Sequence, residues 1–404
     1  MASQHQTVLV TGASGTQGGH VIRELITASS IHPDTSLTIH ALVRDPNSSA
    51  SRDLLALDSS KIKLFKGNFD DMGSLSRAAQ YCTTVFLNVT PVFVDPSGEL
   101  RHARNILSAS LAAGVKYVIL ASVAGLDESK NSPSLDAYPF FKTYFANKAA
   151  IADMVRQPPF PTPEGYTYTI LEPATFLTNY LPPAQTVMYP TLTAPEPTFH
   201  VAYTPTLSMS HLDPADIGRF AARAIYAPAE EFTRLFVNKA IPIASVNMTI
   251  SDVAEALTRA AKHKKTVRVN YLSPEEVAAQ KDANLFIEGQ LMLNEREYLV
   301  HLKKSGVMGS NWAVSRDSLS VRGRDWQRLW HCRCWNGTHL SWMSGAYACL
   351  ECRLGQENQF NVTKERWRSI GIAEEKEVVI CMRCSQSFRS IGLDSNTPPI
   401  WFKS

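Results

Sequence analysis

Residues 1–304 contain no tryptophan and a single cysteine, Cys82, which excludes a disulfide within this segment. No apolar run reaches the roughly 20 residues that a membrane-spanning helix needs. The N-terminus also lacks a basic region followed by an apolar one, the pattern that is typical of a secretory signal. We therefore expect a cytoplasmic protein with reduced thiols and no membrane partner.

The chain also has no large excess of charge of one sign. The chain has 40 basic and 37 acidic residues, a formal net charge of +3, which argues against a nucleic-acid partner. Hydrophobic residues make up 44% and charged residues 19% of the 404 positions, as is usual for a globular enzyme. This length predicts two or three domains, or one large α/β domain with an appendage.

The most informative motif is rich in glycine and lies near the N-terminus. An apolar run ends at Thr11, glycines follow at positions 12, 15 and 18, and a helical pattern then begins. Gly12 would make a tight turn, Gly15 would let the backbone approach a pyrophosphate, and Gly18 would let the helix pack close to the strand. The alternative is a Gly-rich turn without a ligand. We predict that the following residues bind a dinucleotide: Gly12, Ala13, Ser14, Gly15, Thr16, Gln17 and Gly18.

Strand and helix patterns alternate through the first 300 residues. Strands are predicted at 7–11, 37–43, 62–66, 84–88, 117–121 and 166–171. Helices are predicted near 19–28, 74–80, 98–113 and 143–156, and Gly114 is suited to end the third of these. This alternation predicts an α/β fold with a doubly wound parallel Rossmann sheet and ligands at the carboxyl ends of the strands.

The composition changes abruptly near residue 305. All seven tryptophans and six of the seven cysteines lie beyond it, which predicts a domain of residues 1–304 and a Cys/Trp-rich extension of residues 305–404. Four cysteines of the extension form two C-x2-C pairs, the ligand set of a structural zinc site. The alternative, which we favour, is an atypical and poorly ordered extension without metal. The candidate zinc ligands are Cys349, Cys352, Cys381 and Cys384.

Several segments, besides the glycine spacing itself, resemble one protein family. Residues 11–19, with the ending Gln17-Gly18-Gly19, resemble the T-G-A-T-G-x-Q-G-G motif of the NmrA-like family of atypical short-chain dehydrogenases. Further segments that resemble this family are 41–45, 66–71, 114–122, 144–150 and 213–218. The resemblance covers about residues 5–295. It implies a Rossmann core at about 5–175 and an interleaved substrate-binding part at about 176–304.

The end of the second strand bears on the choice of nucleotide. Arg44 would suit the 2′-phosphate of NADP, whereas Asp45 keeps NAD as a less favoured alternative. Asn68 and Phe69 follow the third strand and are expected to flank the adenine. The resemblance implies cofactor contacts after the fourth strand, and the backbone after the sixth strand is expected to touch the nicotinamide. These further candidates are Asn88, Val89, Thr90, Ala174, Thr175, Phe176 and Leu177.

Tyr144 and Lys148 are four residues apart and would share one helix face. They match the Y-x-x-x-K pair of short-chain dehydrogenases, in which the lysine also binds the nicotinamide ribose. Lys148 and the nicotinamide would lower the pKa of Tyr144, and Ser122 would orient the substrate oxygen. Tyr138 and Lys142 have the same spacing, but Pro139 would place Tyr138 outside the helix.

These residues predict an NADP-dependent oxidoreductase that acts on a small organic substrate, plausibly in secondary metabolism, as the resemblance implies. The rival hypothesis is a regulator that senses NADP(H), turns nothing over and docks on a protein partner. The stretch 180–208, with six prolines, is interpreted as the wall of a substrate site. Its alternative is a packed connection. Glu172 departs from the family pattern, which commonly has L-R-P or L-P where this chain has Leu171-Glu172-Pro173.

Overall fold

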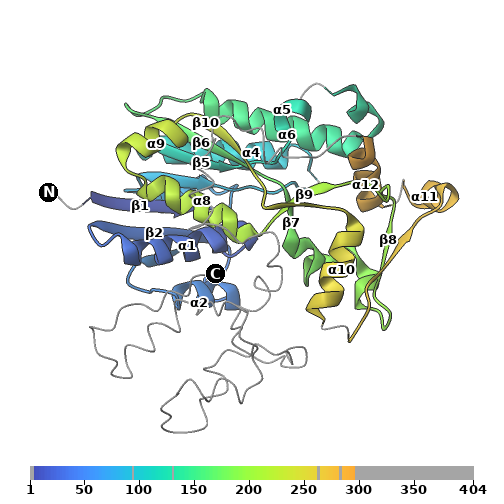
Figure 1. Ribbon diagram of the computed structural model, residues 1–404. Coiled ribbons are helices and arrows are strands. Elements are labelled where there is room, and N and C mark those ends of the chain that lie inside the picture. Colours follow the sequence, from blue (N-terminus) through green and yellow to red (C-terminus); the bar gives the residue numbers. More distant parts are fainter. Residues whose placement is uncertain (1–3, 93–94, 130–131, 262–263, 282–283, 296–404) are drawn as a thin grey trace, which may run out of the picture. The chain divides into compact units, whose positions relative to one another are not determined.

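The computed structural model describes residues 4–92, 95–129, 132–261, 264–281 and 284–295 (Figure 1). Its centre is a seven-stranded sheet in the order β10-β6-β5-β4-β1-β2-β3, and every neighbouring pair is parallel. The order reverses between β1 and β4, the switch point at which such sheets bind ligands. The strands are β1 (Gln4–Val10), β2 (Thr35–Val43), β3 (Ile62–Lys66), β4 (Thr84–Leu87), β5 (Tyr117–Ala121), β6 (Thr167–Pro173) and β10 (Lys239–Ile243).

Helices cover both faces of this sheet, and two apolar clusters result. Because side chains alternate along a strand, Val8 and Val10 of β1 face one cluster, whereas Leu9 faces the other. The first cluster is closed by α1 (Thr16–Ile31), α2 (Ser49–Leu55) and α8 (Pro214–Tyr226). The second is closed by α3 (Met72–Ala79), α4 (Gly98–Ala112) and α6 (Pro139–Arg156). Burial of the strands on both faces confirms the α/β parallel architecture.

A smaller C-terminal part carries two short sheets. One has the order β11-β9-β7, and the other pairs β8 with β12 in parallel. The strands are β7 (Thr175–Phe176), β8 (Thr198–Val201), β9 (Met209–Leu212), β11 (Val246–Met248) and β12 (Arg268–Tyr271). The accompanying helices are α7 (Ala184–Met188), α9 (Ala229–Leu235), α10 (Ile250–Ala260), α11 (Pro274–Gln280) and α12 (Leu285–Glu295).

The six predicted strands coincide with β1 to β6, and four predicted helices coincide with α1, α3, α4 and α6. Gly114 has φ +87° directly after the end of α4, as a helix-ending glycine should. The predicted start of α6 at residue 143 is wrong, because the helix begins at Pro139, whose ring is tolerated in the first turn. Residues 127–137 are not a simple loop, since they contain α5 (Leu126–Ser129) and the 3₁₀ helix η1 (Pro133–Ala137).

The aromatic side chains of the stretch 180–208 pack against one another. Tyr180, Tyr189, Phe199 and Tyr203 are all buried. The Tyr180 ring lies 5.4 Å from that of Tyr189 and 5.9 Å from that of Phe199, measured between ring centroids. Packing against one another removes more apolar area from water than lining an open surface would. This burial favours the packed connection, and the wall of a substrate site stays a prediction.

Candidate functional site

The glycine-rich turn joins β1 to α1 at the switch point of the sheet. Gly12 has φ +61°, a conformation that side chains disfavour, and a Cβ on Gly18 would lie 2.4 Å from the Gly12 carbonyl oxygen. The first residue of α1 is Thr16, and no side chain caps the helix N-terminus at Gly15. Its first turn also carries no acidic residue. The backbone N–H groups and the positive end of a 16-residue helix are thus available to an anion.

Polar side chains fix this turn to the end of β4. The Thr11 hydroxyl donates to the Phe86 carbonyl at 3.0 Å and accepts from the Asn88 backbone N–H at 2.8 Å. Gln17 Nε2 donates to Asn88 Oδ1 at 3.2 Å, whereas Gln17 Oε1 is buried without a hydrogen-bond partner among the described residues. A buried acceptor without a donor points to a ligand group at this position. The bridging role of Thr11 was not predicted, although a buried polar residue at the end of an apolar strand could have indicated it.

Arg44 lies at the carboxyl end of β2, the strand next to β1, and is exposed. Within the part of the chain that the structure describes, no hydrogen bond or ion pair joins its guanidinium to another residue. Ser14 in the turn before α1 and Thr16 at the start of α1 are also exposed, whereas Ala13 is buried. After β4, Val89 is buried and Thr90 is exposed. The Arg44 guanidinium is therefore available to bind a phosphate.

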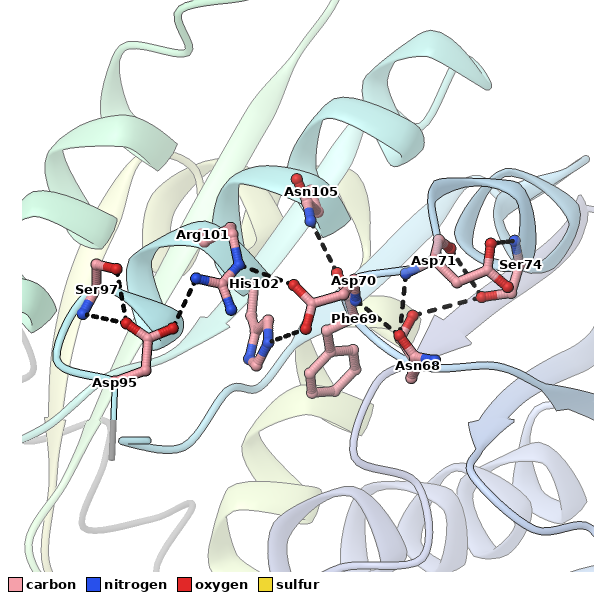
Figure 2. Close-up of polar contacts among 10 residues, drawn as sticks. All are labelled: Asn68, Phe69, Asp70, Asp71, Ser74, Asp95, Ser97, Arg101, His102 and Asn105. Atoms are coloured by element: carbon pink, nitrogen blue, oxygen red, sulfur yellow. Dashed lines mark hydrogen bonds and ion pairs between the residues drawn. The ribbon is translucent and has the colours of Figure 1, made fainter. Parts of the chain in front are cut away.

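Figure 2 shows that Asn68 acts within its own turn. Its Oδ1 accepts from the backbone N–H groups of Asp70 at 2.9 Å and Asp71 at 3.0 Å. An aspartate would accept the same two bonds, which explains why Asn is tolerated here. The neighbouring Phe69 ring packs against the ring of His102 on α4, with 5.5 Å between their centroids. Asn68 thus shapes the turn, and Phe69 remains the candidate for contact with an adenine.

Arg101 of α4 ties this turn to the segment before α4 (Figure 2). Its Nε donates to Asp70 at 2.8 Å and its Nη1 to Asp95 at 2.7 Å. Asp95 in turn accepts from the backbone N–H of Ser97 at 3.1 Å, just before the helix begins. Hydrogen bonds from Arg101 and then His102 hold the pKa of Asp70 below its usual value. The network joins the ends of β3 and β4 next to the glycine-rich turn.

Tyr144 and Lys148 lie on the face of α6 that turns toward the sheet. Lys148 Nζ is 5.6 Å from the centre of the Tyr144 ring. The two residues of the upstream pair, Tyr138 and Lys142, bind other partners. The Tyr138 hydroxyl donates to Glu295 at 2.6 Å, and Lys142 pairs with Asp136 at 2.7 Å. Tyr138 is the N-cap residue, so it lies outside the helix as Pro139 implied. Only the downstream pair shares a face beside the sheet.

The Lys148 ammonium pairs with Glu99 in the first turn of α4, with 2.7 Å between Nζ and Oε1. Both side chains are buried, and Glu99 was not predicted as part of the site. No hydrogen bond joins the Tyr144 hydroxyl to any described residue. Burial, and then the negative charge of Glu99, raise the pKa of Tyr144 well above its usual value. This direction is opposite to the one expected from Lys148, because burial and then the charge of Glu99 both disfavour the phenolate.

Ser122 and Glu172 end the neighbouring strands β5 and β6. The Ser122 backbone N–H donates to the Leu171 carbonyl at 2.8 Å, and both side chains continue the strand face that packs on α6. The Ser122 hydroxyl and Glu172 Oε1 are buried without hydrogen-bond partners among the described residues. Burial and then Asp127 raise the pKa of Glu172 to about 7. Glu172, noted in the sequence only as a departure from the family pattern, thus lies beside a predicted site residue.

The residues at this edge of the sheet fit a dinucleotide. The turn at Gly12 leaves room for a backbone approach, the first turn of α1 offers N–H donors, and Gln17 Oε1 lacks a donor. The segment 174–177, which follows β6 as β7 and the 3₁₀ helix η2 (Leu177–Tyr180), extends from the same edge. The seven predicted phosphate contacts and Asn88 come together here. Arg44, Asn68, Phe69 and Ser122 follow the carboxyl ends of strands β2, β3 and β5 in the same sheet, and Lys148 lies on α6.

A family model described as the NmrA-like family matches residues 4–306. The chain belongs to the NmrA-like family. It is 33% identical over 141 residues to the NmrA-like family domain-containing oxidoreductase ptmS of Penicillium ochrochloron. That alignment covers 33% of this chain and 40% of ptmS, so the chain matches less than half of the length of this relative.

Solved structures share the fold of this NmrA-like protein. The NADPH-dependent quinone oxidoreductase of Escherichia coli, in complex with NADPH, has a TM-score of 0.53 and 20% identity. That match covers 73% of this chain and 91% of the other. NmrA, a negative transcriptional regulator in complex with NAD, has a TM-score of 0.51 and 16% identity over 73% of this chain and 83% of its own. At these identities the likeness concerns the fold alone.

Two further predictions concern a metal site and a membrane. The candidate zinc ligands Cys349, Cys352, Cys381 and Cys384 lie outside the described residues. Within the described ranges, no three His, Cys, Asp or Glu side chains are grouped so that they could hold a metal ion. None of the helices described is long and apolar enough to cross a membrane.

Proposed function

We propose that this NmrA-like protein is an NADP-dependent oxidoreductase that reduces or oxidises a carbonyl or hydroxyl group of a small organic substrate. One observation carries the proposal: Tyr144 and Lys148 share the inner face of α6, at the edge where the glycine-rich turn opens. A nucleotide-binding protein without chemistry needs only the turn. A helix that also presents a tyrosine and a lysine to the same edge supports catalysis.

The cofactor would be held by three groups of residues. The turn of residues 12–18 would bind the pyrophosphate, with Asn88, Val89 and Thr90 beside it. Phe69 would lie against the adenine, and Arg44 would pair with the 2′-phosphate, because its planar guanidinium has no competing partner among the described residues. The backbone of residues 174–177 would contact the nicotinamide. NADP is therefore favoured over NAD.

A bound nicotinamide supplies or accepts the hydride. The protein's own groups handle the proton and the orientation of the substrate. Ser122, whose buried hydroxyl lacks a partner among the described residues, would bind the substrate oxygen. Tyr144 would give the proton to that oxygen, and Lys148 would bind the ribose. Residues 176–304 would form the substrate-binding part.

We further propose a role in secondary metabolism. The support is the family resemblance. The region around α6 is also apolar, because Phe140, Phe141 and Phe145 surround Tyr144. Such surroundings favour a mostly apolar substrate.

The test measures oxidation of NADPH by the purified protein against a panel of ketones, enones and quinones. We expect turnover with at least one of them, and we expect Tyr144→Phe to lower kcat about 10²- to 10⁴-fold, because the proton donor is removed. Calorimetry should show unchanged NADPH binding in this variant. Full activity of Tyr144→Phe would contradict the assignment of the proton donor.

The second candidate function is a regulator that binds NADP(H) without turnover. The pairing of Lys148 with Glu99 favours it, since a lysine balanced in this way does not activate Tyr144. Binding of NADPH without oxidation of it in any assay would support the regulator, as would capture of a protein partner in amounts that follow the NADP/NADPH ratio.

A further inference from the structure

The ion pair between Glu99 and Lys148 joins α4 to α6 beneath the proposed catalytic tyrosine. Its side chains are 1% and 7% exposed, so neither charge is balanced by water. The Glu99 carboxylate lies in the first turn of α4, where the helix dipole favours a negative charge. Neither of its oxygens has hydrogen-bond geometry toward a described residue, although Oε1 is 2.7 Å from the ammonium. The lysine is the one balancing charge that the described contacts give to Glu99.

The same pair provides the charges that face Tyr144. Lys148 comes from α6 itself, and Glu99 comes from α4. Lys142 turns away to Asp136. The remaining acidic groups on the elements around α6 act on Tyr138 or Glu172 instead: Asp127 and Glu128 of α5, and Glu288 and Glu295 of α12.

We propose that Glu99 is a positioning residue: it holds the Lys148 ammonium in place beneath Tyr144 and keeps the tyrosine a neutral proton donor until a substrate oxygen takes the proton. This inference rests on the proposed function, because it concerns the roles of Tyr144 and Lys148.

The proton balance shows at which step Glu99 would act. In reduction the carbonyl carbon gains a hydride from NADPH, the oxygen gains the Tyr144 proton, and the tyrosine recovers a proton from water. In oxidation Tyr144 must first be deprotonated in order to accept the proton of the alcohol. Burial and the Glu99 charge disfavour that phenolate. Lys148, whose charge Glu99 already balances, stabilises the Tyr144 phenolate less than an unpaired lysine would.

The first test follows Tyr144 directly and needs no substrate. Tyrosine is labelled with ¹³C at the ring carbon that bears the hydroxyl, and the Tyr144 signal is assigned from its loss in Tyr144→Phe. We expect the wild-type signal to stay that of the neutral ring above pH 10, the range in which exposed tyrosines ionise. In Glu99→Gln it should titrate at lower pH. The matched control is Glu231→Gln, which breaks another 2.7 Å ion pair, to Arg223, on the opposite face of the sheet.

The second test uses the alcohol–ketone pair turned over by the wild type. In Glu99→Gln the kcat of oxidation at pH 7 should rise about tenfold, and the pH profile of oxidation should move to lower pH. Glu231→Gln should leave both unchanged. Thermal unfolding tests the pair itself: Glu99→Gln should lower the melting temperature, and adding Lys148→Met should recover most of the loss, because no buried charge then lacks its partner.

A wild-type Tyr144 signal that titrates below pH 10, or the same titration in wild type and Glu99→Gln, overturns the inference and leaves the proposed function standing. The wild-type measurement decides the matter even if the variant does not fold. Absence of turnover by the wild type overturns the proposed function instead, while the titration still tests Glu99.

Discussion

Glu172 is a carboxyl group that the fold buries beside Asp127 and near Glu128. Because its pKa rises from 4.5 to about 7, the folded protein keeps a proton that the unfolded chain releases between these pH values. The folded state therefore binds more protons across this window. Stability must fall as the pH rises through it, and remains reduced above about 7.

The isosteric change Glu172→Gln keeps the volume of the side chain and removes its titration. At pH 5 the variant should match the wild type, whereas at pH 8 it should be more stable by up to about 3 kcal/mol, the cost of ionising the buried carboxyl. Urea unfolding at both pH values measures the difference. An equal difference at pH 5 and pH 8 would contradict the burial of a titrating carboxyl here.

At the scale of residues, the glycines of the turn could be predicted because their role depends on local backbone conformation. The positions of Gly12 and Gly18 follow from spacing, and the structure shows the close approach that each permits. Glu99 could not be predicted, since its partner Lys148 lies on another helix and no local pattern joins them. The roles of Ser122 and Tyr144 stay predictions that kinetics must test.

At the scale of elements, the crossing of α1 over β1 depends on the absence of a side chain at Gly18. A Cβ there would lie 2.4 Å from the Gly12 oxygen and 2.8 Å from the Gly12 carbonyl carbon. Backbone cannot move aside as a flexible side chain can. We expect Gly18→Ala to destabilise the fold by about 1–3 kcal/mol and to abolish nucleotide binding.

The neighbouring Gly19→Ala is the matched control. Its Cβ would lie 3.5 Å from the Ala13 oxygen, an ordinary contact, and alanine favours a helix by up to about 1 kcal/mol. Denaturant unfolding and NADPH calorimetry compare the two variants. If Gly18→Ala binds NADPH as tightly as Gly19→Ala does, the turn does not hold the pyrophosphate.

Elements with a strong apolar period could be predicted, whereas those made by tertiary packing could not. The predicted strands 62–66 and 117–121 coincide with β3 and β5, because their apolar runs are continuous and bounded by turn residues. The segment 180–208 has no such period, and its short elements form where aromatic rings pack together. Its prolines suggested a loop, but the burial of Tyr180 and Phe199 organises it instead.

At the scale of the whole molecule, a ligand that binds only the folded protein stabilises all of it. NADPH at 100 times its Kd should raise the free energy of unfolding by about 2.7 kcal/mol, and NADH at the same concentration should raise it less. In Arg44→Gln, affinity for NADPH should fall about tenfold, and the advantage of NADPH over NADH should disappear. Thermal shift measurements with both nucleotides check this. Equal shifts in the wild type would show that Arg44 does not select the phosphate.

The parallel, doubly wound arrangement of the main sheet was predictable from βα alternation. The seventh strand, β10, was not predicted. Pro242 interrupts its sequence, and proline is tolerated there because β10 is an edge strand that pairs only with β6. The division into residues 1–304 and 305–404 stays a prediction, as does the choice between zinc and no metal in the extension.

The central position of β1 has a consequence for synthesis of the protein. During synthesis residues 4–10 emerge before both strands that pair with them, β2 at 35–43 and β4 at 84–87. Until β2 has emerged, β1 exposes two unsatisfied edges to other nascent chains, and until β4 has emerged it exposes one. Chaperone binding to this first segment during translation therefore bears directly on the yield of native protein.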